Sequence, residues 1–216
     1  MSPYEFPISN LDLADWGTTL RNLPTHEERT RALDALWWGQ LASKGWLVNE
    51  LQRYSMPGAP ENVYIFGGWI GTLASMLFNS TININKCRSI DLDPWCESVA
   101  DTLNKTHEMN GWRFKAVTAD MATYEYQTDI RPTIVINTSA EHVTQEVYDR
   151  WYNRIPQNTL VAVQSNNFSH LATGEHVRCS HGLEEFKLMN RVTDEYYCGE
   201  LPTNEYVRYM AIWRKQ

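Results

Sequence analysis

Short apolar runs alternate with stretches of helical periodicity through the middle of the chain. The runs that predict strands are residues 63–66, 86–92, 113–118, 133–136 and 160–163. Helices are expected over residues 72–78, 94–110 and 143–151. Strands separated by helices indicate βαβ units, and therefore a mostly parallel sheet.

The C-terminal part of the chain follows a different pattern. Residues 195–198 and 206–213 are both strand-like, and no helix fits into the connection around residues 199–202. Strands joined in this way are expected to pair antiparallel. We therefore predict an α/β, Rossmann-like sheet of parallel strands that ends in a C-terminal antiparallel hairpin.

The N-terminal segment is expected to be helical only in its second half. Residues 1–28 contain three prolines and are predicted to be irregular. Thr25 and Glu28 match a capping box, so one long helix is expected to begin there and to end at about residue 52 or 54. The predicted units are an N-terminal helical segment or lid, residues 1–60, and a core domain, residues 61–216.

Composition and charge limit the class of protein. A chain of 216 residues, 43% of them hydrophobic, suits one domain with a full core. Its net charge of −7 disfavours nucleic acid as a partner, since phosphate binding relies on basic residues. The four cysteines form no CxxC pair, no apolar run is long enough to span a membrane, and residues 1–10 lack a signal-peptide pattern. A cytoplasmic monomer or homodimer with free thiols is the simplest interpretation.

The first predicted strand runs directly into glycines, which is the arrangement of a ligand-binding turn. Gly67, Gly68 and Gly71 let the backbone turn tightly near a ligand, and the following helix directs free N–H groups at it. Asp91 follows about twenty residues later, at the end of the second predicted strand, where a carboxylate typically binds ribose hydroxyls. Trp69 replaces the second glycine of the dinucleotide fingerprint, which disfavours NAD.

In this order and spacing the chain resembles the class I S-adenosylmethionine (SAM)-dependent methyltransferases. Residues 63–71 resemble motif I of that family, and residues 90–94 resemble its acidic motif after the second strand. Residues 118–121 resemble its loop after the third strand. The resemblance extends from about residue 62 to the C-terminus and implies SAM as the cofactor.

The resemblance also implies roles for single residues. It places the glycines near the methionine part of SAM, Asp91 on the ribose, and Asp120 with Met121 at the adenine. Motif I is divergent, because Ile65 stands where the family usually has an acidic residue and Trp69 replaces the middle glycine. The expected cofactor-binding residues are Gly67, Gly68, Trp69, Gly71, Asp91, Leu92, Asp120, Met121, Asn137 and Lys44.

Polar residues follow the fourth predicted strand, at the sheet edge where ligands bind in this class of fold. His142 is a candidate general base, because imidazole exchanges protons near neutral pH. Glu141 would orient it or bind a cationic substrate, and Asn137 would position the nucleophile or hold the SAM amino group. The alternative is that Thr138, Ser139 and Glu141 only cap the following helix.

A run of amides follows the fifth predicted strand. Gln164, Asn166 and Asn167 are candidate substrate-binding residues, because amides orient ligands through paired donors and acceptors. The alternative is a polar turn, which asparagine favours.

The expected N-terminal helix carries a polar pair within its apolar stripe. The stripe comprises Leu33, Leu36, Trp37, Leu41, Leu47, Val48 and Leu51. Gln40 and Lys44 fall in its middle, where polar groups are unfavourable unless they are satisfied. Gln40, Ser43 and Lys44 are therefore candidate site residues, with Lys44 facing a carboxylate of SAM or of the substrate. The alternative is that the Lys44 stem packs while its amine reaches water.

Three histidines and a cysteine lie close together in the sequence at positions 170, 176, 179 and 181. The spacing of His170, His176, Cys179 and His181 fits no familiar metal-ligand pattern, so no metal is expected and a surface or substrate-side loop is favoured. A further alternative is that His176 joins the substrate pocket opposite Asn166.

These features together predict a SAM-dependent methyltransferase that acts on a small molecule or a protein side chain. One alternative is another SAM-using enzyme, an aminocarboxypropyl transferase similar to the nicotianamine synthases, which the divergent motif I keeps open. A second alternative is a methyltransferase fold without activity that serves as a binding protein.

Overall fold

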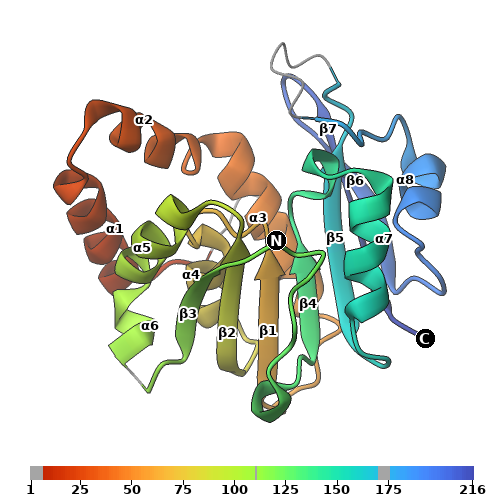
Figure 1. The fold of residues 1–216 in the computed structure, drawn as a ribbon, viewed down its shortest axis with the longest axis horizontal. Helices are drawn as coiled ribbons and strands as arrows, with labels where there is room; N and C mark the ends of the chain where they lie inside the picture. Colours follow the sequence, from red (N-terminus) through yellow and green to blue (C-terminus); the bar gives the residue numbers. More distant parts are fainter. Residues whose placement is uncertain (1–6, 110, 170–175) are drawn as a thin grey trace.

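The computed structural model describes residues 7–109, 111–169 and 176–216, and its described strands form a seven-stranded sheet (Figure 1). The order across the sheet is β3-β2-β1-β4-β5-β7-β6. Neighbours from β3 to β5 are parallel, whereas β7 is antiparallel to both β5 and β6. The strands are β1 (Glu61–Phe66), β2 (Ile84–Asp91), β3 (Phe114–Thr118), β4 (Ile134–Asn137), β5 (Leu160–Asn166), β6 (Tyr197–Pro202) and β7 (Val207–Arg214). The predicted Rossmann-like sheet with its antiparallel hairpin is confirmed.

Helices cover both faces of this sheet (Figure 1). They are α1 (Asn10–Asn22), α2 (His26–Asp34), α3 (Trp38–Leu51), α4 (Thr72–Phe78), α5 (Pro94–Leu103), α6 (Lys105–Met109), α7 (Gln145–Arg154) and α8 (Leu183–Met189), with 3₁₀ turns η1 (Thr128–Ile130) and η2 (Ala140–His142). Side chains of a strand alternate between faces. In β1, Val63 and Ile65 therefore join the core beneath α3 and α4, while Tyr64 and Phe66 join the core beneath α7. Among the described helices, none has both the length and the apolar character that a membrane crossing requires.

The connection from β3 to β4 covers the sheet with aromatic rings. Its described helical structure is limited to the short turn η1. Tyr124 and Tyr126 pack edge-on against Tyr64 and Phe66, with ring centroids 5.1–6.1 Å apart. The Tyr64 hydroxyl donates to the Ile130 carbonyl at 2.8 Å. These rings bury the face of β1 that a crossover helix would otherwise cover.

The N-terminal region differs from the prediction in its first half. Residues 10–22 form α1 rather than irregular structure, so that prediction was wrong. The helix begins with a capping box between Ser9 and Asp12, and Asp12 is also buried against His107 and Asn79. The acidic residue of this box is an aspartate that also has tertiary partners, and the prolines of this region favoured irregular structure.

The single long helix predicted after Thr25 was also wrong. The capping box of Thr25 and Glu28 is present, but α2 ends at Asp34 and α3 begins at Trp38. Trp37 has extended backbone angles (φ −68°, ψ 158°), which interrupt the helical hydrogen bonds. Consequently Leu33 and Trp37 leave the expected apolar stripe and are 55% and 41% exposed.

Other boundaries shift for similar reasons. The helix expected over residues 94–110 divides at Asn104, whose buried side chain bonds to Gly71 and Ser75 of the neighbouring loop and helix. Strand β5 continues to Asn166 instead of ending at residue 163. Helix α8 had no prediction, and it carries Phe186 into the core.

Candidate functional site

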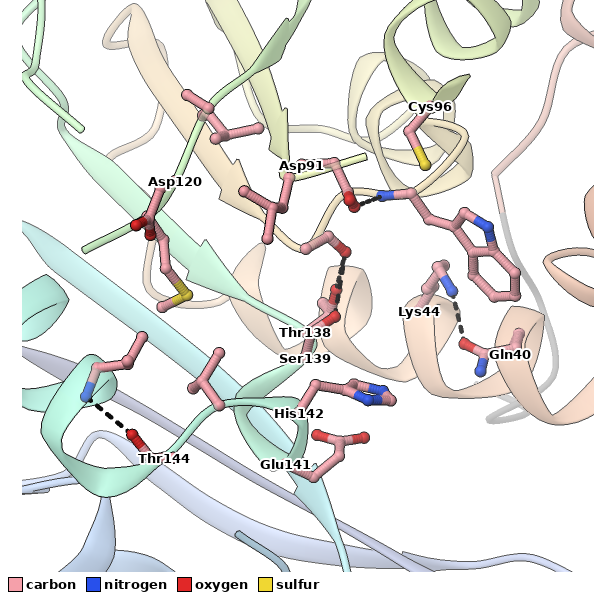
Figure 2. Close-up of a pocket in the computed structure, with 18 of the residues that line it drawn as sticks. Gln40, Lys44, Asp91, Cys96, Asp120, Thr138, Ser139, Glu141, His142 and Thr144 are labelled. Atoms are coloured by element: carbon pink, nitrogen blue, oxygen red, sulfur yellow. Dashed lines mark hydrogen bonds between the residues drawn. The ribbon is translucent and has the colours of Figure 1, made fainter. Parts of the chain in front are cut away.

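A cavity of about 800 Å³ opens at the carboxyl ends of the central strands (Figure 2). This volume is within the usual range for small-molecule sites, and parallel sheets bind ligands at this edge. Figure 2 shows Asp91 and Asp120 on one side of the cavity and Glu141 and His142 on the other. The expected site residues that line it are Gln40, Lys44, Gly67, Trp69, Asp91, Leu92, Asp120, Met121, Glu141 and His142.

The glycine turn after β1 is shaped by its neighbours. Gly67 has a positive φ of 64°, and a Cβ at this position would overlap the Ser139 side chain. The Gly67 carbonyl accepts a hydrogen bond from the Thr138 hydroxyl at 3.1 Å, which holds the loop after β4 against the turn. Gly68 faces β2, Gly71 is the N-cap of α4 with a φ of 78°, and neither residue lines the cavity.

Asp91 joins the glycine turn to the end of β2. Its carboxylate accepts hydrogen bonds from the backbone N–H of Trp69 at 2.9 Å and of Asp93 at 3.2 Å. A carboxylate offers about four lone-pair directions, so capacity remains for ligand hydroxyls. Asp93 caps α5 and forms an ion pair with Arg31, which separates the roles of the two carboxylates.

Asp120 and Met121 follow β3 on the same wall. One Asp120 oxygen accepts the backbone N–H of Ala122 at 2.8 Å, which fixes the loop in a tight turn. The Ala119 N–H donates to the Asp91 carbonyl at 2.9 Å, so the ends of β2 and β3 are tied together. Both carboxylates therefore face one cavity from adjacent strands.

Helix α3 places a buried amine at the cavity. Lys44 is only 5% exposed, and its Nζ donates to Gln40 Oε1 at 2.8 Å (Figure 2). The pKa of Lys44 is lowered to about 7, chiefly by burial and then by the nearby Arg208 charge, with the Glu141 carboxylate opposing the shift. Ser43 is buried beside Lys44, with its hydroxyl bonded to the Gln40 carbonyl, and it does not line the cavity.

A buried ion pair forms the opposite wall. Glu141, in η2, accepts hydrogen bonds at Oε1 from Arg208 at 2.9 Å and from Asn166 at 2.6 Å. Glu141 is 2% exposed and Arg208 is 4% exposed. Burial lowers the pKa of the Arg208 guanidinium, but the Glu141 carboxylate outweighs it and the net shift is upward. Asn137 lies beneath this wall and outside the cavity lining, where its Oδ1 accepts the Ser139 N–H at 2.9 Å.

The amides expected at the rim form hydrogen bonds to other segments of the chain. Gln164 donates to the Ser43 carbonyl at 2.9 Å, and Asn167 accepts the Val207 N–H at 2.8 Å. Gln164, Asn166 and Asn167 do not line the cavity. Gln164 and Asn166 fall outside the lining because β5 is longer than predicted and buries both side chains, and Asn166 supports the wall from behind through Glu141.

The histidine segment divides in space. The rings of His142 and His176 lie 4.6 Å apart between centroids, in an edge-to-face arrangement. Cys179 contacts Asn166 through a weak 3.8 Å interaction, while His181 is exposed. His170 lies outside the described residues.

Several lining residues had no sequence prediction as site residues. The polar and ionisable ones are Arg31, Cys96, Thr138, Ser139, Thr144 and Arg208. Thr138 and Ser139 adjoin predicted positions and were assigned only a capping role. Arg208 lies in the last strand, and nothing in its local sequence distinguishes it from a solvated strand residue.

Comparison with known proteins identifies the fold. No protein-family model matches the chain, and no curated protein matches it in sequence. The N-methyltransferase NodS from Bradyrhizobium japonicum WM9, in complex with S-adenosyl-L-homocysteine (SAH), is similar with a TM-score of 0.63 and 10% identity over 93% of this chain and 98% of NodS. Magnesium protoporphyrin IX methyltransferase (ChlM) from Synechocystis PCC 6803 with bound SAH is similar with a TM-score of 0.62 and 13% identity, over 96% of this chain and 95% of ChlM.

A third solved structure belongs to a nicotianamine synthase. MtNAS in complex with MTA and tNA is similar with a TM-score of 0.58 and 9% identity, over 95% of this chain and 70% of that protein. The chain therefore has the fold of the class I SAM-dependent methyltransferases, as the sequence predicted.

Proposed function

We propose that this chain binds SAM in the cavity and transfers its methyl group to a small molecule or a protein side chain. The observation that carries the proposal is the pair of carboxylates, Asp91 and Asp120, at the ends of adjacent strands on one cavity wall. Both retain acceptor capacity beyond their backbone partners. The solved structures of NodS and ChlM, which share this fold, hold SAH or SAM.

The remaining contacts of SAM follow from this placement. Asp91 would accept hydrogen bonds from the ribose hydroxyls, and Asp120 would accept one from the adenine amino group beside Met121. Gly67 and Trp69 would line the path toward the methionine part. Lys44 would then face the methionine carboxylate or an acidic group of the acceptor.

The reaction would be an in-line displacement at the sulfonium methyl. The acceptor nucleophile forms a bond to the methyl carbon while the carbon–sulfur bond breaks, which leaves SAH. The site contributes chiefly alignment and exclusion of water. His142, which lines the cavity, would take the proton of a protonated acceptor, so His142→Ala is expected to spare SAM binding and to slow turnover.

The N-terminal residues 1–60 would act as the cover of this site. Arg31 of α2 and Gln40 and Lys44 of α3 line the cavity from that segment. They would exclude water from the reacting atoms after SAM and the acceptor have bound.

Calorimetric titration with SAM tests the proposal. Asp91→Ala should weaken SAM binding about 10- to 100-fold, because hydrogen bonds to a charged group contribute about 1.5–3 kcal/mol. Asp93→Ala is the matched control, since it removes a carboxylate two residues away that caps a helix and pairs with Arg31. SAM affinity in Asp91→Ala equal to that of the unaltered protein, with both folded by circular dichroism, would refute the placement.

A second candidate, aminocarboxypropyl transfer, is favoured by the similarity to MtNAS over 95% of the chain. In that reaction the nucleophile attacks the carbon of the aminocarboxypropyl chain, and methylthioadenosine leaves. Chromatography of the products after incubation with SAM and metabolite pools separates the two, since methyl transfer yields SAH. A chain that binds neither SAM nor SAH would instead be a binding protein on this fold.

A further inference from the structure

Three ionisable side chains from two segments of the chain meet beside the cavity. Glu141 and His142 come from η2, and His176 comes from the segment before α8. One potential ligand atom from each lies within 4.8 Å of the other two. Figure 2 shows the Glu141 carboxylate next to the His142 ring, on the cavity side of the loop after β4.

The Glu141 carboxylate has one oxygen without a partner. Oε1 receives the Arg208 guanidinium and the Asn166 amide, whereas the buried Oε2 has no hydrogen-bond partner among the described residues. A buried carboxylate oxygen without a donor is unfavourable. The contacts with Arg208 and Asn166 therefore satisfy one carboxylate oxygen and leave the second able to accept a further donor or a cation.

One ring nitrogen of His176 is held by a backbone carbonyl. Its Nδ1 lies 2.6 Å from the Phe168 carbonyl, which can only accept a hydrogen bond. The neutral ring therefore carries its proton on Nδ1 and keeps a lone pair on Nε2. Metal-bound histidines commonly donate their other N–H to a carbonyl or carboxylate in this manner.

Backbone hydrogen bonds hold the two segments together. The Glu141 carbonyl accepts the N–H groups of both Val177 and Arg178, at 2.9 and 3.0 Å. The Arg178 guanidinium also donates to the Ala140 carbonyl at 3.3 Å. The approach of His176 to Glu141 is therefore fixed by the fold and does not depend on the side chains alone.

We propose that Glu141, His142 and His176 bind one divalent first-row transition-metal ion, with Zn²⁺ as the first candidate. A point exists within about 2.8 Å of three atoms that are at most 4.8 Å apart, and shifts of less than about 1 Å reach the 2.0–2.2 Å of zinc–ligand bonds. Two imidazoles with one carboxylate favour such ions over Mg²⁺ or Ca²⁺, which prefer oxygen ligands. Three protein ligands leave a position for a ligand in the cavity.

The ion would change how the acceptor is activated. A metal ion that binds an oxygen, nitrogen or sulfur of the acceptor lowers its pKa and favours the nucleophilic form. A ring nitrogen of His142 that binds the ion is then unavailable for proton transfer, and His142 would act as a ligand. This use rests on the proposed methyl transfer, whereas binding of the ion does not.

Metal titration of the chelator-treated protein tests the site. Zn²⁺ binding is measured by calorimetry, Co²⁺ binding by its visible absorption, and Mg²⁺ serves as the comparison ion. We expect one equivalent of Zn²⁺ to bind, at least 100-fold more tightly than Mg²⁺. His176→Ala and Glu141→Gln should each weaken Zn²⁺ binding at least tenfold, while His181→Ala, an exposed histidine of the same segment, should leave it unchanged.

Three results would overturn the proposal. They are the absence of stoichiometric Zn²⁺ binding, equal binding by His176→Ala and the unaltered protein, and equal losses in His176→Ala and His181→Ala. Calorimetry with SAM on the same preparations separates this proposal from the proposed function. SAM binding without Zn²⁺ binding refutes only the metal site, and Zn²⁺ binding without SAM binding refutes only the proposed function.

Discussion

The two walls of the cavity are built in different ways. On one wall, the Asp91 and Asp120 carboxylates accept backbone N–H groups from within 22 residues of themselves. On the other wall, Glu141 pairs with Arg208, which is 67 residues away, beside the buried Lys44 of α3. The first wall depends on contacts within and between neighbouring βα turns, whereas the second joins η2 to the last strand of the sheet. Substitutions of the charged residues in the Glu141 wall should therefore change global stability, and substitutions in the Asp91 wall should change mainly ligand affinity.

The largest expected effect is on the second wall. Arg208→Met leaves the Glu141 carboxylate buried without its counterion, so the free energy of unfolding should fall by about 3–5 kcal/mol in urea titrations. Arg191→Met is the matched control. It breaks a partly exposed pair with Asp149 and should lower stability by less than about 1 kcal/mol. Similar losses in the two variants would contradict the contrast between the walls.

A smaller effect is expected where the two walls touch, at the glycine turn. Gly67→Ala places a Cβ against Ser139 at a positive φ and should destabilise the fold by about 2–3 kcal/mol. Gly58→Ala has a similar φ of 74° in open space and should show only the backbone part, about 1 kcal/mol. Adding Ser139→Gly to Gly67→Ala should recover the part of the stability loss that Gly67→Ala shows beyond Gly58→Ala, as measured in thermal melts. Failure of that rescue would mean that the contact with Ser139 is not limiting.

The smallest effect concerns Lys44 and the pH dependence of SAM binding. With its pKa lowered to about 7 by burial and by Arg208 against the opposing Glu141, Lys44 is cationic mainly below pH 7. Binding of a carboxylate favours the cation, so SAM affinity should fall by up to about tenfold as pH rises from about 6 to about 8. Lys44→Met should show a flatter calorimetric profile. Parallel profiles would mean that Lys44 does not face the bound carboxylate.

The same contrast explains how much the sequence predicted. The strand pattern and the positions of Asp91 and Asp120 depend on glycines and carboxylates at fixed spacings, and the structure brings these residues to one cavity. Arg208 reaches the cavity only because β7 pairs antiparallel with β5. Asn166 and Gln164 were assigned to a rim because the sequence could not show that β5 continues beneath it.

The N-terminal region shows a second reason for the differences. The break between α2 and α3 contains neither glycine nor proline between Asp34 and Trp38, so no local signal predicts it. Likewise, Asp12 in α1 is satisfied by His107 and Asn79 from two other segments. A single sequence reveals neither the backbone break at Trp37 nor the tertiary partners of Asp12.

Helices α2 and α3 are attached to the rest of the molecule in different ways, which affects how ligands enter and leave the cavity. Helix α3 is fixed by the buried bond from Gln164 to the Ser43 carbonyl, whereas α2 packs only Ala32 into the core and is otherwise held by contacts nearer the surface, Arg31 with Asp93 and Trp95 with Glu28. We therefore expect entry and exit to proceed by movement of α2 about residues 35–37. Exposed ion pairs weaken with salt, so an enzyme limited by release of its product should turn over faster as ionic strength rises.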